Sequence, residues 1–313
     1  MSLKVSVIMP MDRPGPDADR SIDSVLRQEV PFDFELLVVS SSAVNLPPDD
    51  RVRNIVETNR NPATRRNRAA SEARGEILAF IDDDAFAAPD WLATACSYLD
   101  DHPEVVALGG PDSAPEDSTT GELISETLLA TPWIGSGILA HEAPPGVREI
   151  GSASDIALVN LFVRRSAFRS FDESIGYIGE DSALIHELMA SGRVVYHGSV
   201  RVFHRRRRFP GPYLRQRWRY RVKTGEMLVA GSQAHRTNRR IPLFLTAGTV
   251  AILLAPLAVL PYYLVTLALG ARTTRLPASW WLFLPFFFAL HHLTYYFGIC
   301  WGLLRGSTLR PSR

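Results

Sequence analysis

The stretch Glu76-Ile77-Leu78-Ala79-Phe80-Ile81-Asp82-Asp83-Asp84 decides how the rest of the chain is interpreted. Its apolar part, residues 77–81, is typical of a strand that is buried on both faces of a sheet. Three adjacent carboxylates follow, and their mutual repulsion and loss of hydration are unfavourable. A divalent cation would resolve this conflict, because hard cations bind carboxylate oxygens and keep positions open for substrate phosphates. A solvated acidic turn is the alternative, and the flanking segments have to distinguish the two.

The composition of the 313-residue chain excludes several classes of protein. Its formal net charge of +1 gives no overall attraction to nucleic acid. The two cysteines, Cys96 and Cys300, lie in segments of different character. This excludes a disulfide framework and a cysteine zinc site, and it favours a reducing compartment. The first ten residues, MSLKVSVIMP, are strand-like and contain a proline, so we expect no signal peptide.

Strands and helices alternate along the first 110 residues. Helices are expected to start near residues 22, 62 and 89, between strands at residues 5–8, 35–39, 52–56, 77–81 and 105–108. This order indicates βαβ units and an α/β fold with a mostly parallel sheet and flanking helices. Ligands bind beyond the carboxyl ends of the strands in such sheets. We therefore expect the loops 10–13, 40–42 and 82–84 to converge on one crevice.

The pattern weakens after this region and then returns. Residues 112–154 are rich in proline, glycine, serine and acids around one helical stretch at 122–129, which we interpret as an acceptor-side insertion. A strand is expected at 156–163, and Gly179-Glu180-Asp181 precedes a helix. Short strands at 194–196 and 200–203 follow, and the second ends at His204.

The last third of the chain predicts a membrane anchor. Nine Arg or Lys residues and no acid lie between His204 and Gly225, and aromatic residues are interleaved with them. Apolar segments at about 243–270 and 279–304 are each longer than the ~20 residues that cross a bilayer. They predict a transmembrane helical hairpin. The arginines that flank it put both of its ends, and the short tail after it, in the cytoplasm. The basic segment therefore indicates a bilayer surface in preference to nucleic acid.

Several ordered motifs together resemble one enzyme family. They are Val5–Pro10, the run Asn61 to Asp84 with its Arg66-Asn67, Gly75-Glu76 and Asp-x-Asp pattern, Pro89-Asp90-Trp91-Leu92, Phe171-Asp172, Gly179-Glu180-Asp181, Gly192 and His204. In this order they are similar to a family 2 glycosyltransferase of the Rossmann-like GT-A fold. The resemblance implies a catalytic domain over residues 1–230, a basic juxtamembrane segment within 201–240, and a membrane domain over 241–313.

The resemblance also implies roles for individual residues. Asp82 and Asp84 would hold Mg²⁺ or Mn²⁺, with His204 as an added ligand and Asp83 the least certain member of the cluster. Asp181 would act as the general base. The acceptor or the diphosphate would contact Glu180, Arg217 and Trp218. The nucleotide sugar would bind at Pro10, Asp12, Ser40, Arg66, Asn67, Asp82 and Asp83.

Two departures from the family pattern bear on substrate and product. Residues 38–42 read Val-Val-Ser-Ser-Ser where the family often has acids near the nucleobase or ribose. Arg215-Gln216-Arg217-Trp218 only partly matches a signature of processive polysaccharide synthases, so single additions are expected.

The expected enzyme is a metal-dependent, inverting glycosyltransferase at the cytoplasmic face of a multi-pass inner-membrane anchor. It would act in polysaccharide or glycolipid synthesis on a hydroxyl of a lipid-linked or other glycan acceptor. A polyprenyl-phosphate glycosyltransferase and a non-catalytic membrane scaffold are the alternatives.

Overall fold

The chain folds into two compact units in the computed structural model, which describes residues 3–175, 178–230, 246, 248–250 and 255–308. The first unit contains residues 1–113 and 143–204, and the second contains residues 114–142 and 205–313. The units divide at residue 204, whereas the expected domain boundary lay near residue 230. The assignment of residues 1–230 to a catalytic domain remains a prediction.

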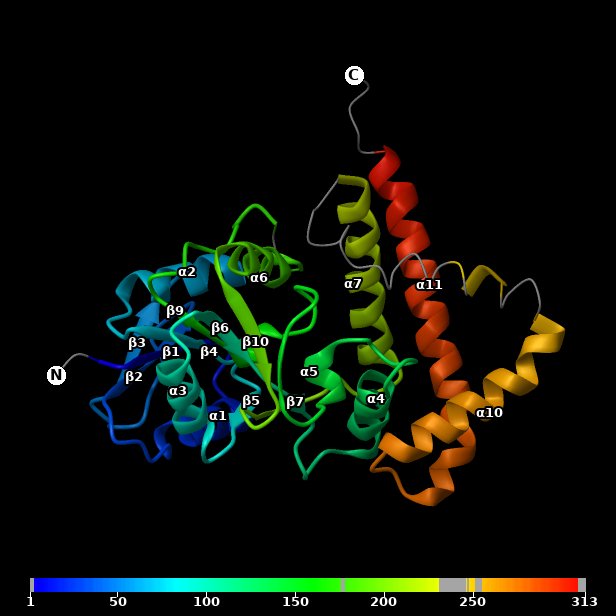
Figure 1. Cartoon of the computed structure of the whole chain (residues 1–313), viewed down its shortest axis with the longest axis horizontal. Coiled ribbons are helices and arrows are strands. Elements are labelled where there is room, and N and C mark those ends of the chain that lie inside the picture. The colour runs from blue at the N-terminus through cyan, green and yellow to red at the C-terminus, as the bar shows by residue number, and fades with distance from the viewer. Residues whose placement is uncertain (1–2, 176–177, 231–245, 247, 251–254, 309–313) are drawn as a thin grey trace. The chain divides into compact units, whose positions relative to one another are not determined.

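The first unit is built on an eight-stranded sheet (Figure 1). Its order is β3-β2-β1-β4-β9-β6-β10-β8. Neighbours pair in parallel from β3 to β4 and between β6 and β10, whereas β9 and β8 are antiparallel to their neighbours. The sheet is therefore mostly parallel, as the sequence predicts. The bounds are β1 Val5–Pro10, β2 Phe34–Ser40, β3 Val52–Val56, β4 Ile77–Phe80, β6 Val105–Gly109, β8 Val147–Glu149, β9 Leu161–Arg164 and β10 Arg193–His197.

The helices of this unit flank the sheet (Figure 1). They are α1 Pro16–Leu26, α2 Pro62–Glu72, α3 Trp91–Asp101 and α6 Glu180–Ser191. The start of α2 follows from its sequence, because the Asn61 side chain accepts the Ala63 N–H at 3.0 Å and Pro62 needs no donor at the first helical position. The apolar faces of α1 and α3 pack in one core with the inner residues of β1, β2 and β4.

The strand order of the large sheet reverses at β1. The chain moves outward from β1 to β2 and β3, then returns past β1 to form β4. Such a switch point opens a crevice at the carboxyl ends of the two central strands. These ends are followed by residues 11–13 and 82–84.

The strand expected at residues 156–163 is shorter than predicted, because Leu158–Asn160 form a 3-10 turn before β9.

A second, three-stranded sheet has the order β5-β11-β7, with β5 Ala85–Ala87, β7 Asp112–Ser113 and β11 Val202–His204. Strand β11 pairs antiparallel with β5, so that His204 lies opposite Ala85. It pairs in parallel with β7, so that Val202 lies opposite Asp112. This small sheet brings the end of β11 beside the acidic turn after β4.

The second unit is helical. It contains α4 Thr120–Ala130, α5 Leu139–Glu142, α7 Gly211–Ala230, α10 Ala255–Thr273, the 3-10 helix η2 Ala278–Phe283 and α11 Leu284–Thr308. Among the described residues, one helical segment, Ala278–Gly306, is long and apolar enough to cross a membrane. The expected first span, 243–270, lies partly outside the described residues. The multi-pass anchor is therefore not supported by the part of the chain that the structure describes.

Candidate active site

The acidic turn after β4 is held by α1. The hydroxyl of Ser21 donates to the carbonyl oxygens of Asp82, at 3.1 Å, and Ala85, at 2.5 Å. This fixes the backbone on both sides of Asp83 and Asp84. All three aspartates are half-buried, so their carboxylates lie where a ligand can reach them.

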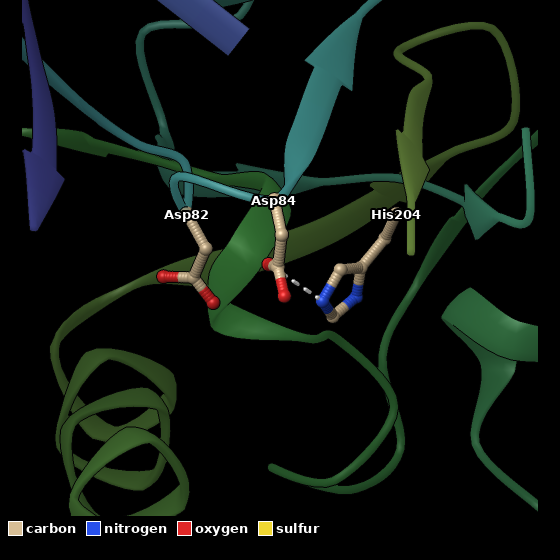
Figure 2. Close-up of side chains that lie close together, drawn as sticks. All are labelled: Asp82, Asp84 and His204. Atoms are coloured by element: carbon tan, nitrogen blue, oxygen red, sulfur yellow. Dashed lines mark ion pairs between the residues drawn. The ribbon is translucent and has the colours of Figure 1, made fainter. Parts of the chain in front are cut away.

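The structure brings Asp82, Asp84 and His204 together. One side-chain ligand atom from each lies within 4.8 Å of the others. The His204 Nε2 atom is 3.2 Å from Asp84 Oδ1. Figure 2 shows the three side chains directed toward a common space, with the two aspartates on the turn after β4 and the histidine at the end of β11. Their grouping is a consequence of the β5–β11 register.

These residues fit a divalent cation by the chemistry of their donors. Two carboxylates and one imidazole nitrogen suit Mn²⁺, and the carboxylates alone suit Mg²⁺. Each of the three side chains is only partly buried. Coordination positions would therefore remain open for oxygen atoms of a diphosphate.

Asp112 is a member of this constellation that the sequence reasoning missed. Its carboxylate Oδ2 lies 3.5 Å from His204 Nδ1, and only 2% of its side chain is exposed. An imidazole that donates Nδ1–H to a carboxylate presents its Nε2 lone pair on the opposite side of the ring. In the sequence, Asp112 follows Gly109-Gly110-Pro111 at the end of an expected strand. The sequence pattern assigns it to the insertion at residues 112–154, and therefore not to the site.

The geometry of this end of the sheet depends on another residue that the sequence did not single out, Asn160. Its side-chain amide donates to Pro111 O at 2.9 Å and to Val200 O at 2.7 Å. Its Oδ1 atom accepts the indole N–H of Trp91 at 2.9 Å. Asn160 thus joins the segments before Asp112 and His204 to α3.

Arg66 links the carboxylate of Asp82, after β4, to that of Glu180, in α6. It is buried in α2, with Nη2 2.9 Å from Asp82 Oδ1 and Nη1 3.4 Å from Glu180 Oε1. Burial and, next, the nearby charge of Asp181 raise the pKa of Glu180 to about 7, and the charge of Arg66 opposes this rise. The Arg66 guanidinium therefore supplies a fixed positive charge beside the acidic turn.

Asp181 lies in the first turn of α6. Its Oδ1 atom accepts the N–H of Ser182 at 2.7 Å, and its side chain is half-buried. Gly179 precedes the helix in a left-handed conformation with φ 100°, which favours glycine. Carboxylates at a helix N-terminus are stabilised by the helix dipole.

Asp83 and the loop after β1 meet at the same crevice. The backbone N–H of Asp12 donates to Asp83 Oδ2 at 3.1 Å, and Pro10 is the last residue of β1. Burial and, next, the charge of Asp84 raise the pKa of Asp83 to about 6, and the hydrogen bond from the Asp12 N–H opposes this rise. Asp83 therefore holds the loop rather than facing Asp82 and Asp84.

Two expected nucleotide contacts are engaged within the protein. The Ser40 hydroxyl donates to Ser42 O at 2.7 Å and accepts from Asn54 Nδ2 at 2.8 Å. The Asn67 amide donates to Phe171 O and to Glu173 Oε1, both at 2.9 Å. Ser40 still lies at the carboxyl end of β2, whereas Asn67 fastens the 171–173 segment to α2.

Arg217 and Trp218 belong to the helical unit. Arg217 is buried in α7 with its guanidinium 4.9 Å from the ring centre of Tyr220, and Trp218 is 38% exposed. Their expected contact with the acceptor or the diphosphate remains a prediction.

Comparison with known proteins adds to this geometry. A model of the family Glycosyl transferase family 2 matches residues 6–168, just over half of the 313 residues. The glucosyl-dolichyl phosphate glucuronosyltransferase of Haloferax volcanii is 39% identical over 62 residues, which is 20% of this chain and 20% of that protein. The match thus spans one fifth of the relative's length.

Similar solved structures have low sequence identity to this chain. One is S. aureus TarS 1–349, with 16% identity and a TM-score of 0.49 over 95% of this chain and 90% of that chain. Another is the mannosyltransferase PcManGT from Pyrobaculum calidifontis in complex with GDP-Man and Mn²⁺, with 20% identity and a TM-score of 0.49 over 98% and 74%. The extent of the family match, together with the α/β sheet and its flanking helices, shows that the chain is a family 2 glycosyltransferase of the GT-A fold.

Proposed function

We propose that this glycosyltransferase moves one sugar from a nucleoside diphosphate sugar to a hydroxyl group of a lipid-linked acceptor, with Mg²⁺ or Mn²⁺ bound at Asp82, Asp84 and His204. The observation that carries the proposal is the grouping of these three side chains at the carboxyl ends of the central strands. An acidic turn alone would not need a histidine from a strand more than 100 residues away.

The donor would bind across the crevice between β1 and β4. The bound cation would neutralise the diphosphate and make it a better leaving group. Arg66 is placed beside Asp82, so its charge would act on the same phosphates. Pro10 and Ser40 end β1 and β2, and Asp12 lies in the loop after β1. All three would line the nucleoside end of the site.

The transfer step needs a nucleophile and a base. Asp181 would accept the proton of the acceptor hydroxyl, whose oxygen attacks the anomeric carbon. The bond from that carbon to the diphosphate oxygen breaks, and the nucleoside diphosphate leaves with the electron pair. Attack from the face opposite the leaving group inverts the anomeric configuration. Glu180 is buried and bound to Arg66, so Asp181 is the better candidate for the base.

The choice of a lipid-linked acceptor rests on two supports. The relative from Haloferax volcanii is named for a sugar transfer to glucosyl-dolichyl phosphate. The second unit also contains an apolar helix of membrane-spanning length. A polyprenyl phosphate acceptor is the second candidate, and its anionic oxygen would need no general base.

The donor is identified by incubating the purified chain with a panel of UDP-, GDP- and dTDP-sugars, each with Mn²⁺ or Mg²⁺, and measuring the nucleoside diphosphate released. We expect one base and sugar to be used well above the others, and release to stop when EDTA removes the metal. Equal rates with and without EDTA would contradict the metal-dependent part of the proposal.

The acceptor class is tested with the identified donor. Polyprenyl phosphate, a polyprenyl-linked monosaccharide and a water-soluble glycoside of the same sugar are compared as acceptors. We expect the lipid-linked sugar to be glycosylated fastest, by one residue only. Equal rates with the soluble glycoside would exclude a lipid-linked acceptor, and transfer to polyprenyl phosphate alone would establish the second candidate.

A further inference from the structure

Helices α7 and α11 of the second unit lie side by side and run in the same direction. Gly298, Gly302 and Gly306 recur every fourth residue on α11, and each meets a successive part of α7. A Cβ atom added at Gly298 would lie 2.8 Å from Arg221 Cβ, and one at Gly306 would lie 2.9 Å from Val229 Cβ. Small residues at this spacing let two helices pack closely. Within Ala278–Gly306, 44% of the 18-residue stretch of high hydropathy is buried inside the protein.

The outer face of α7 is cationic. Arg215, Arg219 and Lys223 recur every fourth residue, with the two arginines exposed and the lysine half-buried. Glu226 is the one acid in α7, and its carboxylate lies 3.8 Å from Arg305 Nε. If α11 crossed a bilayer, α7 would cross beside it and these three charges would lie at membrane depth. Charges at that depth are strongly unfavourable.

The outer face of α11 is apolar. Phe286, Leu293, Phe297 and Leu304 are exposed by 44–63% and fall on one stripe at helical spacing. The preceding 3-10 helix adds four exposed large side chains, Trp280 to Phe283. Tryptophans at such positions suit the boundary between lipid headgroups and acyl chains.

The turn between α10 and α11 is fastened to the insertion that follows β7. Thr274 Oγ1 lies 2.8 Å from Thr127 Oγ1, and Thr273 Oγ1 lies 2.7 Å from Thr131 Oγ1. Arg275 Nη2 donates to Ala114 O at 2.8 Å. Ala114 directly follows Ser113, the last residue of β7 in the first unit. A hairpin that crossed the bilayer would separate this turn from Ala114.

We propose that α7, η2 and α11 form a platform that lies in the plane of one bilayer leaflet and binds anionic lipids. The apolar stripe of α11 enters the acyl region, and the cations of α7 contact headgroup phosphates. The turn at residues 273–275 stays on the same side of the bilayer as Ala114 and α4, with which it forms hydrogen bonds. The membrane is thus bound from one face.

The depth of α11 distinguishes this arrangement from a spanning helix. The full chain, with Cys300→Ser and one spin label at Phe286→Cys, Leu293→Cys or Leu304→Cys, is reconstituted in vesicles of phosphatidylcholine and phosphatidylglycerol. Cys96 is buried and is left in place. Positions 286 and 304 are roughly 27 Å apart along the helix. We expect similar, shallow depths at all three labels from oxygen and nickel-chelate accessibility. A label at residue 293 near the bilayer centre, with the other two shallow, would overturn the proposal.

The side on which the turn lies is tested by crosslinking in the same vesicles. The pair Thr127→Cys with Thr274→Cys should form a disulfide on mild oxidation. After trypsin cleaves the chain at residues 205–208, this disulfide should hold the two fragments together until it is reduced. The pair Thr127→Cys with Leu304→Cys is the matched control and should not crosslink. If the first pair fails to crosslink in membranes but does so in detergent, the turn is on the far side and the proposal is wrong.

Lipid charge is tested with a triple variant. Arg215→Gln, Arg219→Gln and Lys223→Gln together should lower the affinity for vesicles containing phosphatidylglycerol by at least about tenfold, and leave affinity for phosphatidylcholine vesicles unchanged. The control replaces three exposed cations of the first unit, Arg27, Arg68 and Arg169, by glutamine. Equal losses in both variants would contradict a specific role for α7.

Discussion

The buried carboxylate of Asp112 gives the first test at the scale of a single residue. Because Asp112 faces His204 Nδ1, its loss should free the imidazole to rotate and weaken its Nε2 as a ligand. We expect Asp112→Ala to lower Mn²⁺ affinity roughly 10- to 100-fold, measured from the free Mn²⁺ signal in electron paramagnetic resonance. Asp112→Asn, which keeps an acceptor oxygen, should restore part of the affinity.

The control for Asp112 is Asp100→Asn, an exposed acid that pairs with Lys4 at 2.6 Å. It should bind Mn²⁺ like the wild type. If Asp112→Ala also bound Mn²⁺ with wild-type affinity, His204 would either be held by other groups or not bind the metal.

Asp181 is tested by separating chemistry from binding. Asp181→Asn keeps the shape of the side chain but removes the base, so turnover should fall at least about 100-fold. Binding of Mn²⁺ with the nucleoside diphosphate, measured by calorimetry, should stay within about twofold of the wild type. Near-normal turnover would indicate a phosphate acceptor or a different base.

At the scale of the elements, Glu35 on β2 joins β1, β3 and the turn between α2 and β4. Its carboxylate accepts hydrogen bonds from Ser6 Oγ at 2.7 Å, Arg74 Nη2 at 2.7 Å and Arg53 Nη2 at 3.1 Å. Burial raises the pKa of Glu35, but these bonds, led by Arg74, outweigh it and lower the pKa to about 2. This ion-pair network joins β1, β2 and β3 near their amino ends, at the opposite end of β2 from Ser40.

The folded-state pKa of Glu35 lies below its usual value of 4.5, so its stabilisation is complete above about pH 4.5 and is lost as the pH falls toward 2. Glu35→Gln should therefore lower the free energy of unfolding by about 3 kcal/mol at pH 7. The difference from the wild type should shrink below pH 4.5. Urea unfolding in detergent at several pH values measures it, with the exposed Glu76→Gln as control. A difference that is constant from pH 7 to 3 would contradict the assigned pKa.

The positions of the buried strands along the chain and the acidic turn could be predicted from the sequence because their signals are local. Apolar runs predict the buried strands, and three aspartates after one of them predict a crevice at its carboxyl end. The short strands β5, β7 and β11 have two or three residues each and no periodicity, so their pairing was not predictable. Asp112 was missed for this reason, since its approach to His204 depends on the register of that small sheet.

The arginines of α2 show the same limit at a finer level. Arg65 and Arg68 lie three residues apart in one basic run, and the sequence alone does not distinguish a buried arginine from a solvated one there. In the structure Arg65 is buried and donates to Met11 O at 3.2 Å, whereas Arg68 is exposed and pairs with Glu72 at 2.7 Å. Gly75 follows α2 at a position where glycine often ends a helix. It is instead required because β1 approaches so closely that an added Cβ atom would contact the backbone of Ser6. Both outcomes depend on tertiary packing.

At the scale of the whole molecule, the metal and the nucleotide together should stabilise the first unit more than either does alone. In the proposed site the diphosphate would supply ligands that complete the cation's coordination, and the cation would screen the repulsion among the carboxylates. A ligand at 100 times its dissociation constant stabilises by about 2.7 kcal/mol. We expect the unfolding temperature to rise with Mn²⁺ and the cognate nucleoside diphosphate together. An equal rise with the nucleotide and EDTA would contradict a metal-bridged site.

The most direct test is the rate of nucleoside diphosphate release from the cognate donor as a function of Mn²⁺ concentration, in the wild type and in Asp84→Asn. Asp90→Asn, an exposed acid at the start of α3, serves as the matched control. The wild type and the control should saturate with Mn²⁺, and Asp84→Asn should need at least about tenfold more metal or be inactive. A rate in Asp84→Asn that follows the wild-type metal dependence would contradict the assignment of Asp82, Asp84 and His204 as the cation site.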